Sequence, residues 1–351
     1  MVDSWDFSKE EINESALLVG EESEKYIRYL EATTDQYMDA LKDIERRCTK
    51  QRDGDTDTIM QDLTVLNESM LQVCEQFEKV VKNEAAIKAA RAAFRDKTDP
   101  ILSKSYAIKN VRTWPLGYQG DYKTIEAAYR NTPMSEGIGY YLDKYLLSST
   151  LGVGLRERIQ MLADLLRSEI SKRHSPKVLD IACGSCREVH DIVPEIEKSN
   201  AHFTCLDLDS EALDFALNRL SYAGLSSSQV EFIQYNALRL FDYETAISAF
   251  GMQDIIYSVG FFDYLADDFL TKLLHTLYQI LKPGGKLIAA FKDANRYRPQ
   301  LYHWFADWNG FLQRTQSDFE NILSNAEIPS DAFTMRRVKS GSIIFYLATK
   351  L

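Results

Sequence analysis

Residues 177–186 read KVLDIACGSC, and this stretch decides the fold of the C-terminal half of the chain. A short apolar run enters a loop with a single glycine, directly before a predicted helix. The same alternation of apolar run and amphipathic segment repeats after it, in HFTCLDL (202–208), VEFIQYNAL (230–238), DIIYSVG (254–260) and GGKLIAAFK (284–292). It predicts an α/β fold with a doubly wound, mostly parallel sheet. From about Thr334, a strand, a Ser-Gly-Ser turn and the run IIFYLATKL predict a terminal antiparallel hairpin.

The loop after the first predicted strand favours a cofactor without phosphate groups. A dinucleotide fold needs the fuller G-x-G-x-x-G, because several backbone amides close on a pyrophosphate. This loop keeps only Gly184. S-adenosylmethionine carries no phosphate, so one glycine suffices, and Asp180 can hold loop amides or the ammonium group of that cofactor.

The ends of the next strands also carry polar side chains. Asp207 follows Gly184 by 23 residues and can accept hydrogen bonds from both ribose hydroxyls. The alternative is a helix N-cap, but Asp209 or Ser210 suits that role. Asn236 can read the adenine edge, or it is simply a turn asparagine. The fourth strand ends at Ser258-Val259, beside the expected transferable group. Lys282–Gly285 is expected to form a turn into the fifth strand.

These pieces, in order at successive strand ends, resemble the class I S-adenosylmethionine-dependent methyltransferases over about residues 176–351. LKPGGKLI (281–288) is similar to a late signature of that superfamily. The resemblance implies a Rossmann-like domain that binds S-adenosyl-L-methionine. The residues expected at the cofactor are Tyr118, Arg158, Asp180, Ala182, Gly184, Asp207, Leu208, Asn236, Ala237, Ser258 and Val259.

A narrower resemblance lies partly upstream of this domain. RTWPLGYQGDYKTIEAAY (112–129), YSVGFFDYL (257–265) and HWFADWNGFLQRTQSDFENI (303–322) look like the bacterial group that includes hydroxy-fatty-acid methyl ester synthases. A Gly-Tyr-x-Gly-Asp block of that group is matched at residues 117–121. The chain departs from the group in its helical N-terminus and in the polar block 292–295.

The N-terminal part is expected to be helical. Apolar residues recur at helical spacing from about residue 10 to 97, with a polar break at 51–55 and a third helix from Asn83 to about Arg95, ending near Asp99-Pro100. We expect a helical domain at 1–109, a connecting or lid region at 110–175 that includes a helix from about 154 to 173, and the cofactor domain at 176–351.

Methyl transfer from a sulfonium is an in-line displacement, so the enzyme mainly positions a nucleophile and excludes water. A carboxylate acceptor is already ionised near neutral pH and needs no general base. For an amine or hydroxyl acceptor, His303 is a candidate base and Asp263 a candidate amine ligand, each weighed against a structural role. Tyr264 and Tyr118 are the strongest candidates among the aromatic residues.

Aromatic residues are dense where the acceptor should bind, and they either line an apolar pocket or simply pack a helix against the sheet. They are Phe261, Phe262, Tyr264, Tyr297, Tyr302, Trp304, Phe305 and Trp308, with Tyr118, Tyr122 and Tyr129 upstream.

Other polar residues have two interpretations. Arg156 or Arg158 can pair with the cofactor's carboxylate, although a solvent-facing helix surface is slightly favoured. Cys183-Gly-Ser-Cys186 coincides with the cofactor loop, which argues against a redox motif. The lack of a second ligand pair at suitable spacing argues against zinc, so no metal is expected.

Charge and composition restrict the partners. The chain has 351 residues and a net charge of −11, and residues 1–100 hold 14 Lys/Arg against 23 Asp/Glu. Such a balance repels a phosphate backbone, so nucleic acid is not expected. No run approaches the ~20 apolar residues of a membrane span. Five scattered cysteines suit a reducing cytoplasm. A small-molecule substrate is expected, and a homodimer is left open.

Three functions compete. The first is methyl transfer to a small-molecule carboxyl or other O/N acceptor. In the second, the cofactor's aminobutyrate chain closes on its own sulfonium carbon, as in proteins of methyltransferase-like fold that release azetidine-2-carboxylate and methylthioadenosine. The third is non-catalytic binding, which the intact set Asp180, Gly184, Asp207 and Asn236 argues against.

Overall fold

The computed structural model describes residues 21–49 and 56–351, which form two compact units that divide between Ser103 and Lys104. The segment expected to connect two domains, residues 110–175, belongs to the second unit. The polar break expected at 51–55 lies outside the described residues. Among the helices of the described ranges, none is long and apolar enough to cross a membrane.

The first unit contains three helices, α1 (Glu21–Thr49), α2 (Thr56–Val81) and α3 (Glu84–Leu102). Their buried faces follow the helical spacing of the apolar residues, and Tyr37 donates a hydrogen bond to the buried Asn67 at 2.8 Å. α3 ends at Leu102, two residues after the end expected near Asp99-Pro100. Pro100 sits in the last turn, where it removes one helical hydrogen bond, and the buried Ile101 and Leu102 continue the helix.

The second unit is built on a seven-stranded sheet of order β3-β2-β1-β4-β5-β7-β6. β1 to β5 are parallel, and β7 pairs antiparallel with both β5 and β6, which confirms the predicted doubly wound sheet and terminal hairpin. The strands are β1 (Lys177–Ile181), β2 (His202–Asp207), β3 (Val230–Gln234), β4 (Gln253–Val259), β5 (Leu281–Lys292), β6 (Phe333–Arg337) and β7 (Ile343–Thr349).

Residues Lys282–Gly285, expected as a turn before the fifth strand, are instead part of β5. Gln253 of β4 pairs with Leu281, and Ile255 pairs with Lys286, so the two strands keep pairing around an irregularity. The extra residues of β5 form a bulge there, so the strand continues through the expected turn.

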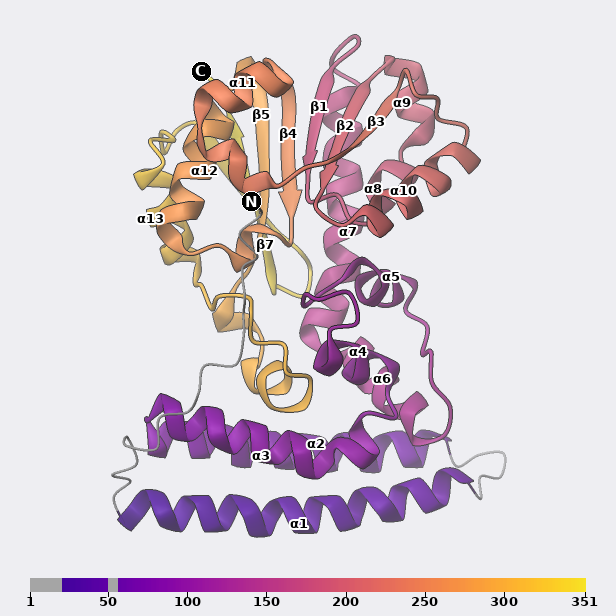
Figure 1. Cartoon of the computed structure of the whole chain (residues 1–351), viewed down its shortest axis with the longest axis vertical. Helices are drawn as coiled ribbons and strands as arrows, with labels where there is room; N and C mark the ends of the chain where they lie inside the picture. Colours follow the sequence, from indigo (N-terminus) through magenta and orange to yellow (C-terminus); the bar gives the residue numbers. More distant parts are fainter. Residues whose placement is uncertain (1–20, 50–55) are drawn as a thin grey trace, which may run out of the picture. The chain divides into compact units, whose positions relative to one another are not determined.

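Helices cover both faces of the sheet and bury a separate apolar cluster on each (Figure 1). The first cluster contains residues of α7 (Thr150–Ile170), α8 (Arg187–His190), α9 (Val193–Ser199) and α10 (Ser210–Tyr222). The second contains residues of η2 (Ala237–Phe241), α11 (Tyr243–Phe250), α12 (Asp267–Gln279) and α13 (Gln316–Asn325). Two covered faces explain why the strands read as continuous apolar runs.

A helical cap lies beyond the carboxyl ends of the parallel strands (Figure 1). We use the name cap for residues 104–155, which contain α4 (Tyr106–Thr113), α5 (Tyr122–Arg130), α6 (Ile138–Ser148) and the first turns of α7. A second segment, residues 293–315, leaves the end of β5 through η4 (Ala294–Arg296) and the π-helical turn η5 (Leu301–Phe305). Residues of both segments line one cavity, which is described below.

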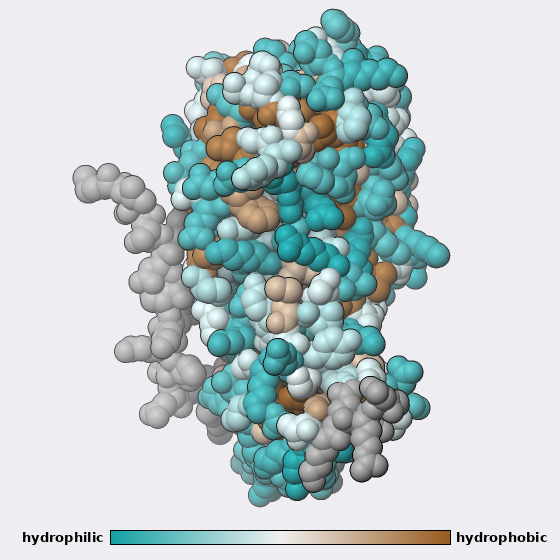
Figure 2. Space-filling view, turned by 90° about the vertical axis from the view of Figure 1, so that its right-hand side faces the viewer, coloured by the Kyte–Doolittle hydropathy of each residue, from teal (hydrophilic) through white to brown (hydrophobic). Residues whose placement is uncertain are grey.

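The face of the molecule shown in Figure 2 is mostly hydrophilic, with hydrophobic side chains in small groups between the polar ones. Small groups of this kind are normal on a protein surface and need no partner to cover them.

Candidate cofactor and acceptor site

The loop after β1 holds three residues in the left-handed region. Ala182, Gly184 and Cys186 have φ angles of 58°, 54° and 46°. Only Gly184 adopts this conformation freely, and a left-handed non-glycine residue costs about 1–3 kcal/mol. The glycine can be recognised in the sequence, but the left-handed conformation of its two neighbours cannot. Contacts with the rest of the protein must therefore hold those two residues in place.

Asp207 at the end of β2 is tied to that loop. Its carboxylate accepts the Gly184 amide at 2.8 Å on one oxygen and the Asp209 amide at 3.0 Å on the other. Burial raises the pKa of Asp207, and these backbone hydrogen bonds counteract the effect. Asp209 is the N-cap of α10, as expected, so Asp207 is not needed there. Each Asp207 oxygen keeps a free lone pair for a ribose hydroxyl.

Asp180 faces inward beneath the loop. It lies near the Cys186 sulfur and the Glu188 carboxyl, and Tyr257 donates to Glu188 at 2.9 Å. Burial, with the charge of the neighbouring acid, raises the pKa of Asp180, and burial also raises the pKa of Glu188. The loop amide of Gly184 donates to Asp207 instead. Contact of Asp180 with the cofactor ammonium stays a prediction.

At the ends of β3 and β4, polar side chains form hydrogen bonds to the protein backbone. Asn236 accepts the Leu238 amide at 3.0 Å and caps η2, while no hydrogen bond among the described residues engages its side-chain nitrogen. Ser258 donates to the Ile181 carbonyl at 2.7 Å and joins β4 to β1. Leu208, directly after β2, is 65% exposed and offers an apolar surface. Adenine contact at Asn236 stays a prediction.

Arg158 corrects the sequence interpretation, which slightly favoured a solvent-facing helix. Its side chain is 4% exposed, and it donates to the Tyr129 hydroxyl at 2.6 Å. A Cβ on Gly260, at the end of β4, would lie 3.0 Å from Arg158. Within the described residues the Arg158 Nε has no hydrogen-bond partner. A buried guanidinium with an unused donor fits an anionic ligand group such as the cofactor's carboxylate.

α5 is fastened to the loop by a residue that the sequence analysis missed. Glu126 is 4% exposed and accepts hydrogen bonds from Ser185 at 3.0 Å, Arg187 at 3.0 Å and Arg219 at 2.6 Å. Burial would raise the pKa of Glu126, but Arg219 and the other donors hold it below its usual value. The missed signal was an acidic residue on the inner face of a helix that Asp121 caps.

The Gly-Tyr-x-Gly-Asp block spans the strand ends. Tyr118 donates to the Asp209 carboxylate at 2.8 Å, and Gln119 donates to the Asp307 carbonyl at 2.6 Å. Gly120 permits close approach, because a Cβ there would lie 2.8 Å from both Tyr264 and Trp308. The block therefore joins the end of β2 to the segment that follows β5.

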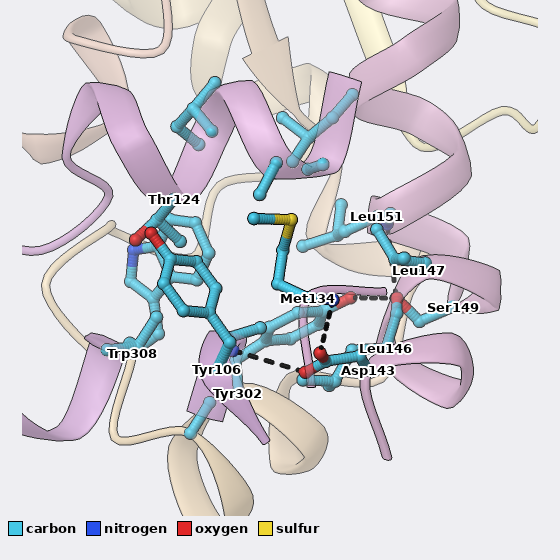
Figure 3. A pocket seen from close by; sticks show the side chains of 18 of the residues that line it. Tyr106, Thr124, Met134, Asp143, Leu146, Leu147, Ser149, Leu151, Tyr302 and Trp308 are labelled. Atoms are coloured by element: carbon cyan, nitrogen blue, oxygen red, sulfur yellow. Dashed lines mark hydrogen bonds between the residues drawn. The ribbon is translucent and has the colours of Figure 1, made fainter. Parts of the chain in front are cut away.

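An apolar cavity of about 80 Å³ lies between the cap and segment 293–315. Figure 3 shows side chains of α4, α5, α6 and α7 directed into it. Polar groups at its wall are already paired, as Asp143 accepts the Met134 amide at 2.9 Å and Ser149 bonds to Tyr302 at 3.0 Å. The lining also includes Tyr106, Thr124, Leu146, Leu147, Leu151, Lys292, Trp308 and Phe311.

Comparison with known proteins fits this geometry. The family model described as a methyltransferase domain matches residues 179–287. The chain carries a methyltransferase domain. A domain of this description is that of a transferase. No curated protein matches the sequence.

Solved structures resemble the chain at low identity. A possible exported protein from Bordetella parapertussis is 18% identical, with a TM-score of 0.56 over 90% of this chain and 96% of that one. An O-methyltransferase family protein from Burkholderia thailandensis is 16% identical, with a TM-score of 0.43 over 59% and 62%. Magnesium protoporphyrin IX methyltransferase from Synechocystis, solved with bound S-adenosylmethionine, is 13% identical, with a TM-score of 0.41 over 57% and 82%. The first shows that the fold extends over nearly the whole chain.

The three candidate catalytic residues, Asp263, Tyr264 and His303, have different surroundings. Asp263 is buried and forms an ion pair with Lys292. Tyr264 accepts a hydrogen bond from Trp308 at 2.7 Å, and burial raises its pKa, so it is a neutral phenol. His303 is buried in η5 and is not among the cavity-lining residues. Catalytic roles for the three stay predictions.

The aromatic residues divide between both interpretations. Tyr302 and Trp308 line the cavity, whereas Phe262, Trp304 and Phe305 are fully buried. Tyr106, Phe311 and Lys292 are among the cavity-lining residues that were not predicted from the sequence. Lys292 was noticed only as part of a polar block that departs from the similar bacterial group.

The cysteines near the loop are free and buried. Asp180, Cys183 and Cys186 have ligand atoms within 4.8 Å of one another, a spacing that a metal ion can bridge. The contact with Cys186, together with burial, raises the pKa of Cys183, which disfavours the thiolate that binds metals and reacts with oxidants. We interpret these thiols as packing groups.

Proposed function

We propose that the protein transfers the methyl group of S-adenosylmethionine to a carboxylate on a small, largely apolar molecule held in the cavity. The cavity itself is the observation that supports this proposal. Lys292, at the end of β5, lines it. Lys292 is close enough to Arg158, beside Gly260, to sense its charge. An apolar site therefore adjoins the strand ends where the cofactor is expected.

The residues at the strand ends suit the cofactor's groups. Asp207 would accept hydrogen bonds from the ribose hydroxyls, and Asn236 and Leu208 would flank the adenine. Arg158 would pair with the carboxylate, since it is a buried cation with an unused donor. When bound, the cofactor supplies an electrophilic methyl group on a positively charged sulfur.

For a carboxylate acceptor, the protein mainly has to position the acceptor and exclude water. An acceptor oxygen bonds to the methyl carbon as the carbon–sulfur bond breaks, so the carboxylate and sulfonium charges cancel and no proton moves. Among the described cavity-lining residues only Asp143 and Lys292 are ionisable apart from tyrosines, and both are already paired. A wall without a free base suits an acceptor that is ionised beforehand.

The direct test is calorimetric titration of the pure protein with S-adenosylmethionine, followed by product analysis. We expect binding, with stabilisation of about 2.7 kcal/mol at 100 times the dissociation constant. The cofactor incubated alone should stay intact and should yield S-adenosylhomocysteine once a suitable carboxylate is added. Methylthioadenosine released from the cofactor alone would instead establish cyclisation, and absence of binding would favour a non-catalytic protein.

The surroundings of the enzyme are also part of the proposal. The acidic chain suits a small-molecule substrate rather than nucleic acid, and five free cysteines suit a reducing cytoplasm. A homodimer is the assembly to test, by light scattering at several protein concentrations.

A further inference from the structure

Lys292 is an unusual residue to find beside an apolar cavity. It is 5% exposed and follows the buried run of β5. Lysine is almost never fully buried unless it is paired, because removing an ammonium from water carries a large free-energy penalty. Burial accordingly lowers the pKa of Lys292, the charge of Asp263 counteracts this, and the charge of Arg158 lowers it further.

Asp263 does not use all the hydrogen-bond donors of the Lys292 ammonium. One Asp263 oxygen pairs with the Lys292 ammonium, and the other accepts the Lys292 backbone amide at 3.2 Å. An ammonium has three N–H donors. Among the described residues, Asp263 is the only hydrogen-bond acceptor of the Lys292 ammonium. The remaining surroundings include the Phe311 ring at 4.7 Å and the Tyr264 ring at 5.8 Å from ammonium to ring centre.

The charges around Lys292 favour an anion. Arg158 lies close enough to affect it and has no carboxylate hydrogen bond among those of the described residues. Glu188, which is close enough to Arg158 to be affected by its charge, forms a buried pair with Asp180, and burial raises the pKa of both carboxyls, which favours the protonated forms. The other charged group at the cavity, Asp143, already accepts hydrogen bonds from Ser105, Ala107 and Met134. A cationic ligand would have to displace those donors.

We propose that Lys292 selects the acceptor by binding its carboxylate through the ammonium donors that Asp263 leaves unused. This inference rests on the proposed function and adds the residue that distinguishes a carboxylate from a neutral group of the same shape. Asp263 then holds the ammonium in place, as a positioning residue, and does not contact the acceptor. The apolar wall binds the rest of the molecule.

The charge change during transfer predicts how Lys292 should act. The acceptor is anionic when it binds and loses that charge as its oxygen takes the methyl group. An ion pair with Lys292 therefore stabilises the bound acceptor more than the transition state, and such an interaction lowers KM without raising kcat. Replacement of Lys292 should raise KM for carboxylates at least tenfold and leave kcat unchanged or higher. A general base for a hydroxyl would give the opposite pattern, with loss of kcat.

The test uses benzoate, phenylacetate and 3-phenylpropionate, each beside its primary amide, with S-adenosylhomocysteine present. Binding is measured by calorimetry to the full-length protein and to K292M. The native protein should bind the best carboxylate at least tenfold more tightly than its amide. K292M should lose this preference and keep its affinity for S-adenosylhomocysteine. K286M is the matched control, because Lys286 lies on the same strand and its ammonium donates to Thr349 at 2.5 Å.

A second variant guards against misfolding. K292M leaves Asp263 buried and unpaired, so the double variant K292M/D263N, which removes both charges, is measured beside it. The inference is overturned if no carboxylate binds the native protein more tightly than its amide, or if the preference survives in the double variant. Failure to bind S-adenosylhomocysteine at all would overturn the proposed function instead, so the two failures are distinguishable.

Discussion

Two regions form the candidate site, and their residues come together in different ways. The first is the edge of the sheet where the parallel strands end, which we call the edge, and the second is the helical cap. The edge uses short segments that lie where successive parallel strands end, and Gly184 and Asp207 meet there directly, through a 2.8 Å hydrogen bond. The cap uses single residues such as Glu126 and Asp143, whose partners include residues up to 93 positions away in the chain. In the proposed function the edge binds the cofactor, whereas the cap and segment 293–315 shape the site of the acceptor.

We expect the largest loss of stability from a substitution that breaks the link between the edge and the cap. Glu126→Ala leaves Arg219 and Arg187 without their shared carboxylate and should lower the free energy of unfolding by about 3 kcal/mol. It should also weaken cofactor binding, because Ser185 loses its hold on α5. Chemical denaturation measures the first effect and calorimetry the second. Glu136→Gln, at an exposed position of the cap, is the control and should change neither.

The next effect concerns the edge alone. Asp207→Asn removes the charge that accepts the Gly184 and Asp209 amides and is expected to accept the ribose hydroxyls. Affinity for S-adenosylmethionine should fall about 30-fold, or about 2 kcal/mol. Asp214→Asn, exposed on α10, should bind like the native protein. If Asp207→Asn binds equally well, the ribose role is wrong and the aspartate serves only to shape the loop.

The same contrast explains what the sequence could predict. Strand alternation, the terminal hairpin and the N-cap at Asp209 follow from local patterns, since each depends on residues near one another in the chain. Arg158 was harder, because helical spacing alone does not show that the cap buries the side of α7 facing Gly260. Lys292 could not be placed at a cavity, because its partner Asp263 and the ring of Phe311 come from two other segments.

The third prediction concerns pH and the acid pair beneath the loop. Glu188 has a raised pKa because it is buried, so the folded state keeps a proton that the unfolded state releases. Native stability should therefore fall as the pH rises from the ordinary glutamate pKa through the raised one. Glu188→Gln cannot ionise and still offers an oxygen to the Tyr257 hydroxyl. Its melting temperature relative to the native protein should be higher at pH 8 than at pH 5. Asp214→Asn, which is exposed, should show no such difference, and equal shifts at both pH values would contradict the prediction.

The smallest effect tests whether the cofactor loop stores strain. Ala182 sits at φ 58°, where a Cβ is unfavourable, and glycine there should relieve about 1–2 kcal/mol. Glycine also gains freedom in the unfolded chain, which offsets about 0.5–1 kcal/mol of that relief. Ala182→Gly should therefore raise the free energy of unfolding slightly, by about 0.5–1 kcal/mol. Ala163→Gly, buried within α7, pays the entropy without any relief and should lower it. Changes of opposite sign in the free energy of unfolding would show that the backbone at Ala182 is strained. Equal losses for the two variants would show that Ala182 carries no such strain.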